Sequence, residues 1–210
     1  MKSLFLLFIS FLISISLLGQ KNQVQITYLP SFSNTLESSY SLESFPARVY
    51  DFSPVLTHSF SAKYLRKLNN DNRLSLGGGI LNTGFEEEFS FDPPQLSGGV
   101  TTEFRATYLS IPIEYLINRG KLEIGVGISA NFIIDQTTTT SGSMPLGLGV
   151  GDPEPIIDSF EDFAFGLGVS ANYLIEVSEK WGIVTGIRCD YFTPINQINA
   201  ALNLGLRLTL

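Results

Sequence analysis

The stretch from Ala200 to Leu210 alternates between leucine and small or polar residues almost without a break. Successive side chains of a β-strand point to opposite faces, so this period of two predicts a strand with one continuous leucine face. Such a face has to be covered, either by a protein core or by the hydrocarbon of a membrane. The leucine face comprises Leu202, Leu204, Leu206, Leu208 and Leu210, and the other face comprises Asn203, Gly205, Arg207 and Thr209.

The same alternation recurs along the chain after residue 22, where we find no convincing amphipathic helix of ordinary length. It is clearest in Leu122–Ile134 and Phe163–Val177, where glycine, serine and asparagine occupy the second face. Turn-forming residues separate these segments. The pattern predicts eight strands, which are Val24–Leu36, Pro54–Leu68, Arg73–Phe85, Phe104–Ile117, Leu122–Ile134, Phe163–Val177, Trp181–Tyr191 and Ala200–Leu210.

The connections between these strands alternate between short and long. Outer-membrane barrels have an even number of strands, short periplasmic turns and longer extracellular loops, whereas a β-sandwich has no reason to sort its loops in this way. We therefore expect an all-β fold, an antiparallel up-and-down transmembrane β-barrel of about eight strands. The short connections are Asn69–Asn72, Asn118–Gly120 and Ser178–Lys180, the long ones are 37–53, 87–101 and 136–160, and a modest one is Thr193–Asn199.

The N-terminal segment has the layout of a secretory signal peptide. Lys2 precedes an apolar run from Leu4 to Leu18, and polar residues follow. We expect residues 1–19 to be removed, with cleavage after Ser16 as the alternative, and residues 20–210 to form the outer-membrane β-barrel domain. A single anchoring helix is the competing interpretation, but the run is shorter than the roughly 20 residues that a spanning helix needs.

The charges of the chain restrict its partners and the orientation of its strands. With 13 Lys and Arg against 20 Asp and Glu, the net charge is −7, so the chain lacks the basic excess that binds nucleic acid phosphates.

A Lys or Arg on the lipid face near the middle of a membrane costs about 2–4 kcal/mol. Charged residues should therefore face the lumen, and the alternation places Glu114, Glu123, Glu176, Arg188 and Arg207 there.

A family resemblance rests on four segments: TYLSIPIEYLI (Thr107–Ile117), LEIGVGISANF (Leu122–Phe132), AFGLGVSANYLIE (Ala164–Glu176) and NLGLRLTL (Asn203–Leu210). Together they resemble the small outer-membrane β-barrels of Bacteroidota, often called the PorT-like or OmpA-like β-barrel family. The resemblance implies an outer-membrane location and work beside secretion or motility machinery. The terminal strand also looks like the signal read by the barrel assembly machinery, although that signal usually ends in an aromatic residue and this chain ends in Leu210.

We expect no catalytic, cofactor-binding or metal-ligating residues in the barrel. The interior of an eight-stranded barrel is just wide enough for its own side chains. The inward faces mix glycine and serine with Glu and Arg, so we predict a closed lumen filled by polar groups and ion pairs. Gly77, Gly78 and Gly79 lack the GxxxxGK[ST] pattern of a phosphate loop, and glycine in a strand allows bends or close packing.

His58, the only histidine, offers an enzymatic alternative. Asp51 and Ser53 precede it at the expected extracellular rim, where a histidine beside a carboxylate could act as the general base of a lipid or peptide hydrolase. An ordinary solvated histidine at the rim is the plainer interpretation.

Acidic residues gather in and just after the expected loop 136–160. Clustered carboxylates can hold calcium, but the EF-hand spacing is absent, and Pro153 and Pro155 indicate an extended segment. A solvated acidic loop is the plainer expectation, and the run Glu86–Glu88 has the same interpretation. The residues that could bind calcium are Asp152, Glu154, Asp158, Glu161 and Asp162.

Cys189, the only cysteine, falls on the predicted lipid-facing side of the seventh strand, where a thiol behaves as a small hydrophobe. A lone cysteine excludes a disulfide framework within the chain. Trp181, Tyr191, Tyr115 and Tyr173 are expected in the aromatic girdles at the two membrane interfaces.

These patterns predict a non-enzymatic outer-membrane barrel that acts as a structural element or docking platform. We expect outer-membrane lipid as its surroundings, envelope or extracellular proteins as partners through the long loops, and no nucleic acid. One alternative is the rim-active hydrolase that depends on His58. The other is a soluble secreted lipocalin-like or β-sandwich binder, in which the apolar faces would form a core.

Overall fold

A computed structural model describes residues 22–36, 40–42, 47–69, 71–92, 99–143, 160–193 and 196–210. The expected signal peptide, residues 1–19, lies outside the described residues. None of the residues described belongs to a helix that is long and apolar enough to cross a membrane. The described strands are β1 (Gln23–Thr35), β2 (Tyr40–Leu42), β3 (Ala47–Ser53), β4 (Val55–Lys67), β5 (Asn72–Asp92), β6 (Gly99–Arg119), β7 (Leu122–Ser143), β8 (Phe163–Glu176), β9 (Trp181–Thr193) and β10 (Gln197–Thr209).

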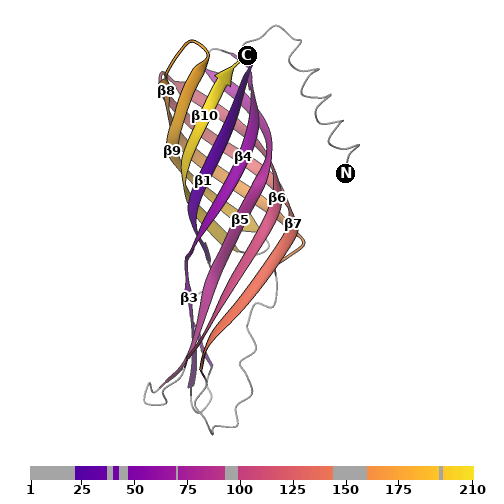
Figure 1. The fold of residues 1–210 in the computed structure, drawn as a ribbon, viewed down its shortest axis with the longest axis vertical. Helices are drawn as coiled ribbons and strands as arrows, with labels where there is room; N and C mark the ends of the chain where they lie inside the picture. Colours follow the sequence, from indigo (N-terminus) through magenta and orange to yellow (C-terminus); the bar gives the residue numbers. More distant parts are fainter. Residues whose placement is uncertain are drawn as a thin grey trace.

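Eight of these strands close into a barrel, which Figure 1 shows from the side. The strand order around the ring is β1-β4-β5-β6-β7-β8-β9-β10, and β10 pairs with β1 to complete it. All eight pairings are antiparallel. The predicted antiparallel up-and-down barrel of about eight strands is confirmed.

The two ends of the barrel differ in how the strands are connected. The turns β4–β5, β6–β7 and β8–β9 lie at the same end as both termini of the described chain, where Leu210 N donates to Asn22 O at 2.9 Å and Thr209 N to Lys180 O at 2.8 Å. We call this the turn end and the opposite one the loop end. Gly120 has a φ of +65° in the β6–β7 turn, a conformation that favours glycine. The three predicted short turns are thus confirmed, and they lie together at one end of the barrel.

The predicted loops 37–53, 87–101 and 136–160 are wrong in part, because strands continue through them at the loop end. β3 pairs with β5 from Ser53↔Glu86 to Ala47↔Asp92, and β6 pairs with both β5 and β7 beyond the predicted strand ends. Figure 1 shows this extension projecting from the barrel. We call it the outer sheet; it consists of β2, β3, Phe85–Asp92 of β5, Gly99–Phe104 of β6 and Gln136–Ser143 of β7.

Side chains along the barrel strands alternate between the lumen and the outer wall. In β8 the exposed and buried positions alternate from Phe163 to Ser170. Gly77 confirms the close-packing interpretation, because a Cβ there would lie 2.8 Å from both Ala62 O and Lys63 Cγ. The predicted faces of Leu122–Ile134 and Ala200–Leu210 also hold, with apolar side chains outside and polar ones inside.

Candidate functional site: the lumen, the outer wall and the loop end

An ion-pair cluster fills the lumen near the turn end. Arg207 in β10 and Glu123 in β7 form two parallel hydrogen bonds, Nη2–Oε1 at 2.7 Å and Nη1–Oε2 at 3.0 Å. Arg73 in β5 donates to the same carboxylate, Nη1–Oε2 at 2.9 Å, and to Asn118 Oδ1 at 2.7 Å. Gln25 Oε1 accepts from Arg207 at 2.6 and 2.9 Å. One carboxylate thus links two guanidinium groups that come from opposite parts of the wall.

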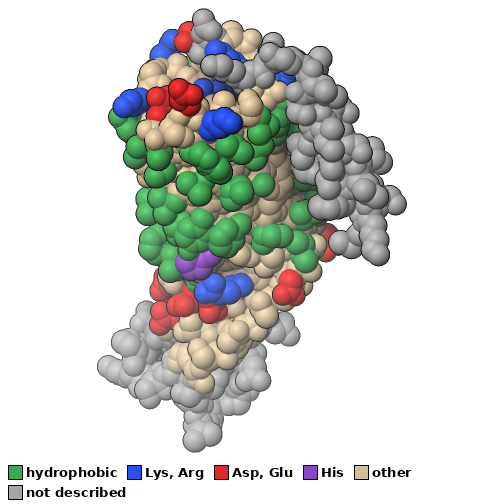
Figure 2. All heavy atoms as spheres, turned by 45° about the horizontal axis from the view of Figure 1, so that its top comes forward, with side chains coloured by type: hydrophobic (Ala, Val, Ile, Leu, Met, Phe, Trp, Pro, Cys, Tyr) green, Lys and Arg blue, Asp and Glu red, His purple; other side chains and the backbone are tan. Residues whose placement is uncertain are grey.

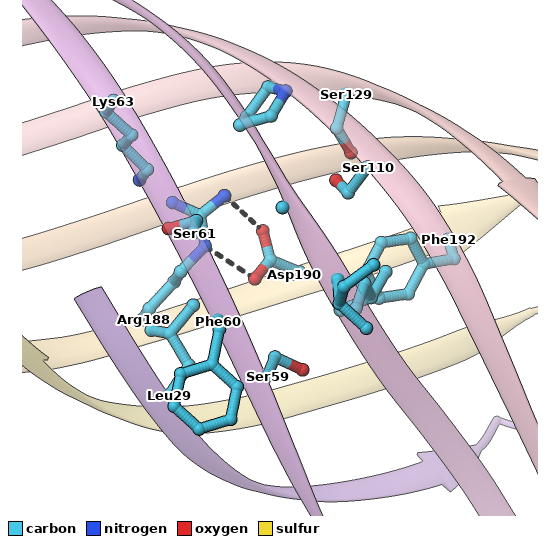
Figure 3. A pocket seen from close by; sticks show the side chains of 14 residues that line it. Leu29, Ser59, Phe60, Ser61, Lys63, Ser110, Ser129, Arg188, Asp190 and Phe192 are labelled. Atoms are coloured by element: carbon cyan, nitrogen blue, oxygen red, sulfur yellow. Dashed lines mark hydrogen bonds and ion pairs between the residues drawn. The ribbon is translucent and has the colours of Figure 1, made fainter. Parts of the chain in front are cut away.

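A second cluster occupies the middle of the lumen and joins β4, β6 and β9. Lys63 Nζ lies 2.8 Å from Glu114 Oε2, and Arg188 also pairs with the Glu114 carboxylate. Arg188 binds Asp190 through two hydrogen bonds, Nε–Oδ2 at 2.6 Å and Nη2–Oδ1 at 2.8 Å, which Figure 3 marks with dashed lines. The four groups carry two positive and two negative charges, so the cluster is balanced without a bound ion.

Glycines on the wall make room for these charged side chains. A Cβ on Gly168 in β8 would collide with the Asp190 carboxylate and lie 2.9 Å from Arg188 Nη2. A Cβ on Gly127 in β7 would lie 2.6 Å from Glu114 Cγ. The glycine-alternating strands of the sequence therefore provide the space that the ion pairs occupy.

An aromatic cluster closes the lumen towards the loop end. Phe85 and Phe104 stack with ring centroids 4.9 Å apart, and Phe160 contacts Phe85 edge-on at 5.9 Å. The fully buried Tyr108 donates from Oη to Glu161 O at 3.1 Å. Between this cluster and the middle ion pairs lies a cavity of about 40 Å³, lined in part by Ser110, Ser129 and Asp190 (Figure 3). The described part of the lumen is thus filled by packed side chains, as expected for a closed barrel.

The outer wall carries a continuous apolar belt. Figure 2 shows it as a green band with Lys, Arg, Asp and Glu on either side. Lys67, Arg119 and Lys121 border it at the turn end, and Glu103 and Asp135 border it at the loop end. The belt residues are Ile26, Phe32, Leu56, Phe60, Leu74, Ile80, Leu109, Ile111, Ile113, Tyr115, Leu122, Ile124, Val126, Ile128, Phe132, Ile134, Phe163, Phe165, Leu167, Val169, Tyr173, Ile175, Trp181, Ile183, Ile187, Leu202, Leu204 and Leu206.

Four of the five charged residues predicted to face the lumen do so, namely Glu114, Glu123, Arg188 and Arg207. Glu176, the fifth, is the last residue of β8, and its side chain is exposed at the turn end. The prediction missed the inward-facing Lys63 and Arg73. Lys63 could have been found, because it shares a face with the polar residues Thr57, Ser59 and Ser61 of the same strand.

His58 lies on the outer wall, at the edge of the belt that faces the loop end (Figure 2, purple). Its Nδ1 shares a hydrogen bond of 2.6 Å with Tyr28 Oη, and the two rings stack with centroids 5.9 Å apart. Ser53, predicted beside it, instead donates to Glu86 Oε1 at 3.4 Å. Asp51 lies in β3, and its register partner across the strand pair is Glu88 of β5. The structure thus places the histidine in an aromatic pair rather than with the predicted rim partners.

The remaining predicted residues are distributed over the outer wall and the loop end. Cys189 is half-buried on the outer face beside Ile187, as predicted. Trp181, Tyr115 and Tyr173 are exposed there too. Of the suggested calcium ligands, Asp152, Glu154 and Asp158 lie outside the described residues, and the residues that are described contain no group of three or more His, Cys, Asp or Glu able to hold a metal ion.

Similar solved structures are small barrels of the bacterial surface. One is Neisserial surface protein A, which is 17% identical in sequence and has a TM-score of 0.43. The similarity covers 90% of this chain and 97% of that protein's chain. The outer membrane protein AlkL in lipid bilayers has 11% identity, coverages of 91% and 90% and a TM-score of 0.44. The outer membrane protein OprG from Pseudomonas aeruginosa has 7% identity, coverages of 91% and 97% and a TM-score of 0.38.

These similarities are distant, and the fold assignment rests on the strand pairing of the chain itself. No protein-family model and no curated protein sequence matches the chain. The PorT-like resemblance therefore stays a prediction.

Proposed function

We propose that the chain is a small outer-membrane β-barrel protein with a closed lumen, which acts as a structural element or docking platform at the cell surface. The observation that carries this proposal is the inversion of polarity between the two sides of the wall. Ion pairs such as Arg207–Glu123 are buried inside, while a continuous belt of apolar side chains faces outward. A barrel in water would expose that belt at a large free-energy cost, whereas lipid covers it.

The inverted polarity weighs against the soluble lipocalin-like binder. Such a protein holds an apolar ligand in its interior, and its outer wall is polar. Here the middle of the interior holds Lys63, Glu114, Arg188 and Asp190, and the cavity beside them has a volume of about 40 Å³, enough for a few water molecules but not for a ligand. The interior is therefore suited to stability rather than to ligand storage.

The outer sheet supports the docking role. It extends the strands beyond the belt, so that a folded surface projects on the side where outer-membrane barrels face the medium. Envelope or extracellular proteins are the partners we propose for it, and the PorT-like resemblance favours work beside secretion or motility machinery. The pairing of His58 with Tyr28 on the outer wall favours a non-enzymatic role over the hydrolase alternative.

The experiment that tests this proposal is expression of the full chain followed by membrane fractionation. We expect the protein to separate with outer membranes and to migrate differently on a gel before and after heating, because a folded barrel resists detergent until it is heated. A protein that stays soluble without detergent would overturn the proposal.

A further inference from the structure

The outer sheet has two edge strands, β2 and β7, and part of the β7 edge has no strand partner among the described residues. β6 pairs with β7 along its full length, from Arg119↔Leu122 to Gly99↔Ser143, but β8 pairs with the other side of β7 only from Leu122 to Phe132. One more bond follows, in which Ile133 N donates to Asp162 O at 2.9 Å. From Thr137 to Gly142, no residue within the described part of the chain pairs with this second edge.

A bulge marks the point where β7 leaves the barrel. The register changes from Tyr108↔Ile133 to Thr107↔Asp135, so one additional residue of β7 is accommodated there. Bulges bend a strand and increase its twist. The bulge thus separates the part of β7 that belongs to the closed barrel from the part with an open edge.

Beyond the bulge at its base, the β7 edge from Thr137 to Gly142 lacks the charged residues and prolines that usually protect an edge. Edge strands are commonly blocked by Lys, Pro, bulges or short length. The edge here reads TTTTSG from Thr137 to Gly142, with neither charge nor proline, and its side chains are exposed. Threonine has a high β-propensity. This edge therefore retains the features that let a further strand pair with it.

Three exposed carboxylates surround the foot of this edge, where β7 emerges from the barrel. Asp135 belongs to β7, and Glu161 and Asp162 are placed beside it, because Phe160 N donates to Gln136 Oε1 at 3.2 Å. A strand added antiparallel to β7, as every pair in this sheet is antiparallel, would run from the tip towards the foot. The carboxylates would then meet its C-terminal end.

We propose that the Thr137–Gly142 edge of β7 binds an extended segment of a partner protein by strand addition, with basic residues at the C-terminal end of that segment. This inference rests on the proposed docking function and specifies where and what the barrel docks. Main-chain hydrogen bonds to the edge provide the affinity, and the three carboxylates select the charge and direction of the partner.

A second copy of the chain fits this edge poorly. Two copies in one membrane have the same orientation, so both β7 strands run outward and their edges cannot meet antiparallel. Parallel pairing is slightly less stable per residue. Both copies would also bring Asp135 and its two neighbouring carboxylates to the same contact, and like charges placed together are unfavourable.

The test uses the full chain, folded in zwitterionic nanodiscs, and fluorescent peptides measured by anisotropy. The first peptide, TVTVTVTKK, has two lysines at its C-terminal end. The second, KKTVTVTVT, has them at its N-terminal end. The third, TVTVTVTEE, has two glutamates in place of the C-terminal lysines. We expect TVTVTVTKK to bind about three- to tenfold more tightly than the other two, which is the ratio that two exposed ion pairs provide. N-methylation of alternate residues of this peptide should abolish binding, because it removes the main-chain donors.

Variants of the protein locate the contact. The triple variant Asp135→Asn, Glu161→Gln, Asp162→Asn should remove the preference, whereas Glu176→Gln with Glu179→Gln, at exposed positions of the turn end, should keep it. Equal binding of the two lysine peptides would show attraction by charge alone and would overturn the inference. Absence of binding, for instance because another part of the chain covers the edge, would overturn it too. Heat-dependent gel migration of the same samples tests the barrel separately, so either proposal can fail without the other.

Discussion

Arg207 and Glu123 are separated by 84 residues along the chain and meet across the lumen in a pair of hydrogen bonds of 2.7 and 3.0 Å. Their strands, β10 and β7, are not neighbours in the ring, because β9 and β8 lie between them. The pair therefore connects distant parts of the wall through the interior, and only 2% and 3% of the two side chains are exposed.

Replacement of this carboxylate should destabilise the barrel strongly. In Glu123→Gln, the guanidinium groups of Arg73 and Arg207 lose their shared anion, and removal of one partner from a buried ion pair costs about 3–5 kcal/mol. Urea unfolding in phospholipid vesicles, followed by the fluorescence of the single tryptophan, Trp181, measures the change. Glu176→Gln, at an exposed site, is the control; equal unfolding curves for the two variants would contradict the prediction.

A side chain at Gly168 should disturb the middle ion pairs. The Cβ of Gly168→Val would collide with the Asp190 carboxylate, and overpacking of this kind costs about 1–3 kcal/mol. Gly78→Val is the matched control in β5, because no atom apart from its own chain neighbours lies within 4 Å of the position of its Cβ. Heat-dependent gel migration should show the folded form melting at a lower temperature for the first variant only.

A charge in the belt should oppose membrane insertion. Ile128 lies on the outer wall with 46% of its side chain exposed, and an Arg at the lipid midplane costs about 2–4 kcal/mol. We expect Ile128→Arg to insert less efficiently into phospholipid vesicles than the unmodified chain. Thr139→Arg, in the outer sheet, should insert normally, and a normal yield for both variants would count against a lipid-facing belt.

Truncation of the aromatic cluster should loosen the loop end. Phe104 is 1% exposed and stacks on Phe85, so Phe104→Ala should cost about 3–5 kcal/mol. Hydrogen exchange should accelerate in the outer sheet more than in β8 or β9. Phe32→Ala removes the same side chain from the exposed outer wall, and a comparable loss there would argue against the role of the cluster.

The barrel could be predicted from the sequence because burial inside and lipid outside impose the same period of two. Wherever both constraints apply, as from Leu122 to Ile134, the predicted faces are those of the structure. The outer part of β7 was missed because water lies on both of its faces: Thr137–Thr140 are all exposed, so no alternation in polarity marks the strand. This part of β7 is held by main-chain pairing with β6, which side-chain patterns do not report.

The ion pairs of the lumen were predictable only in part. The alternation of side chains along a strand places Glu114 and Arg188 on the inner face. It does not determine which residues of other strands lie at the same height in the barrel. The partnership of Lys63 with Glu114 depends on the stagger between β4 and β6 across β5, which follows from the closed ring. The partner of His58 could not be predicted for a related reason, because a rim position does not specify which side of the wall a side chain occupies.

The pairing of β1 with β10 sets the order of events when the protein is made. The first strand of the barrel, β1, has its register partner in β10, as in Gln23↔Thr209, so the ring cannot be completed until β10 has been synthesised. Until then β1 and the growing sheet present unpaired edges, which are prone to aggregation. Protection of these edges until β10 arrives is therefore a requirement of this topology, and truncation of β10 should leave an open sheet rather than a smaller barrel.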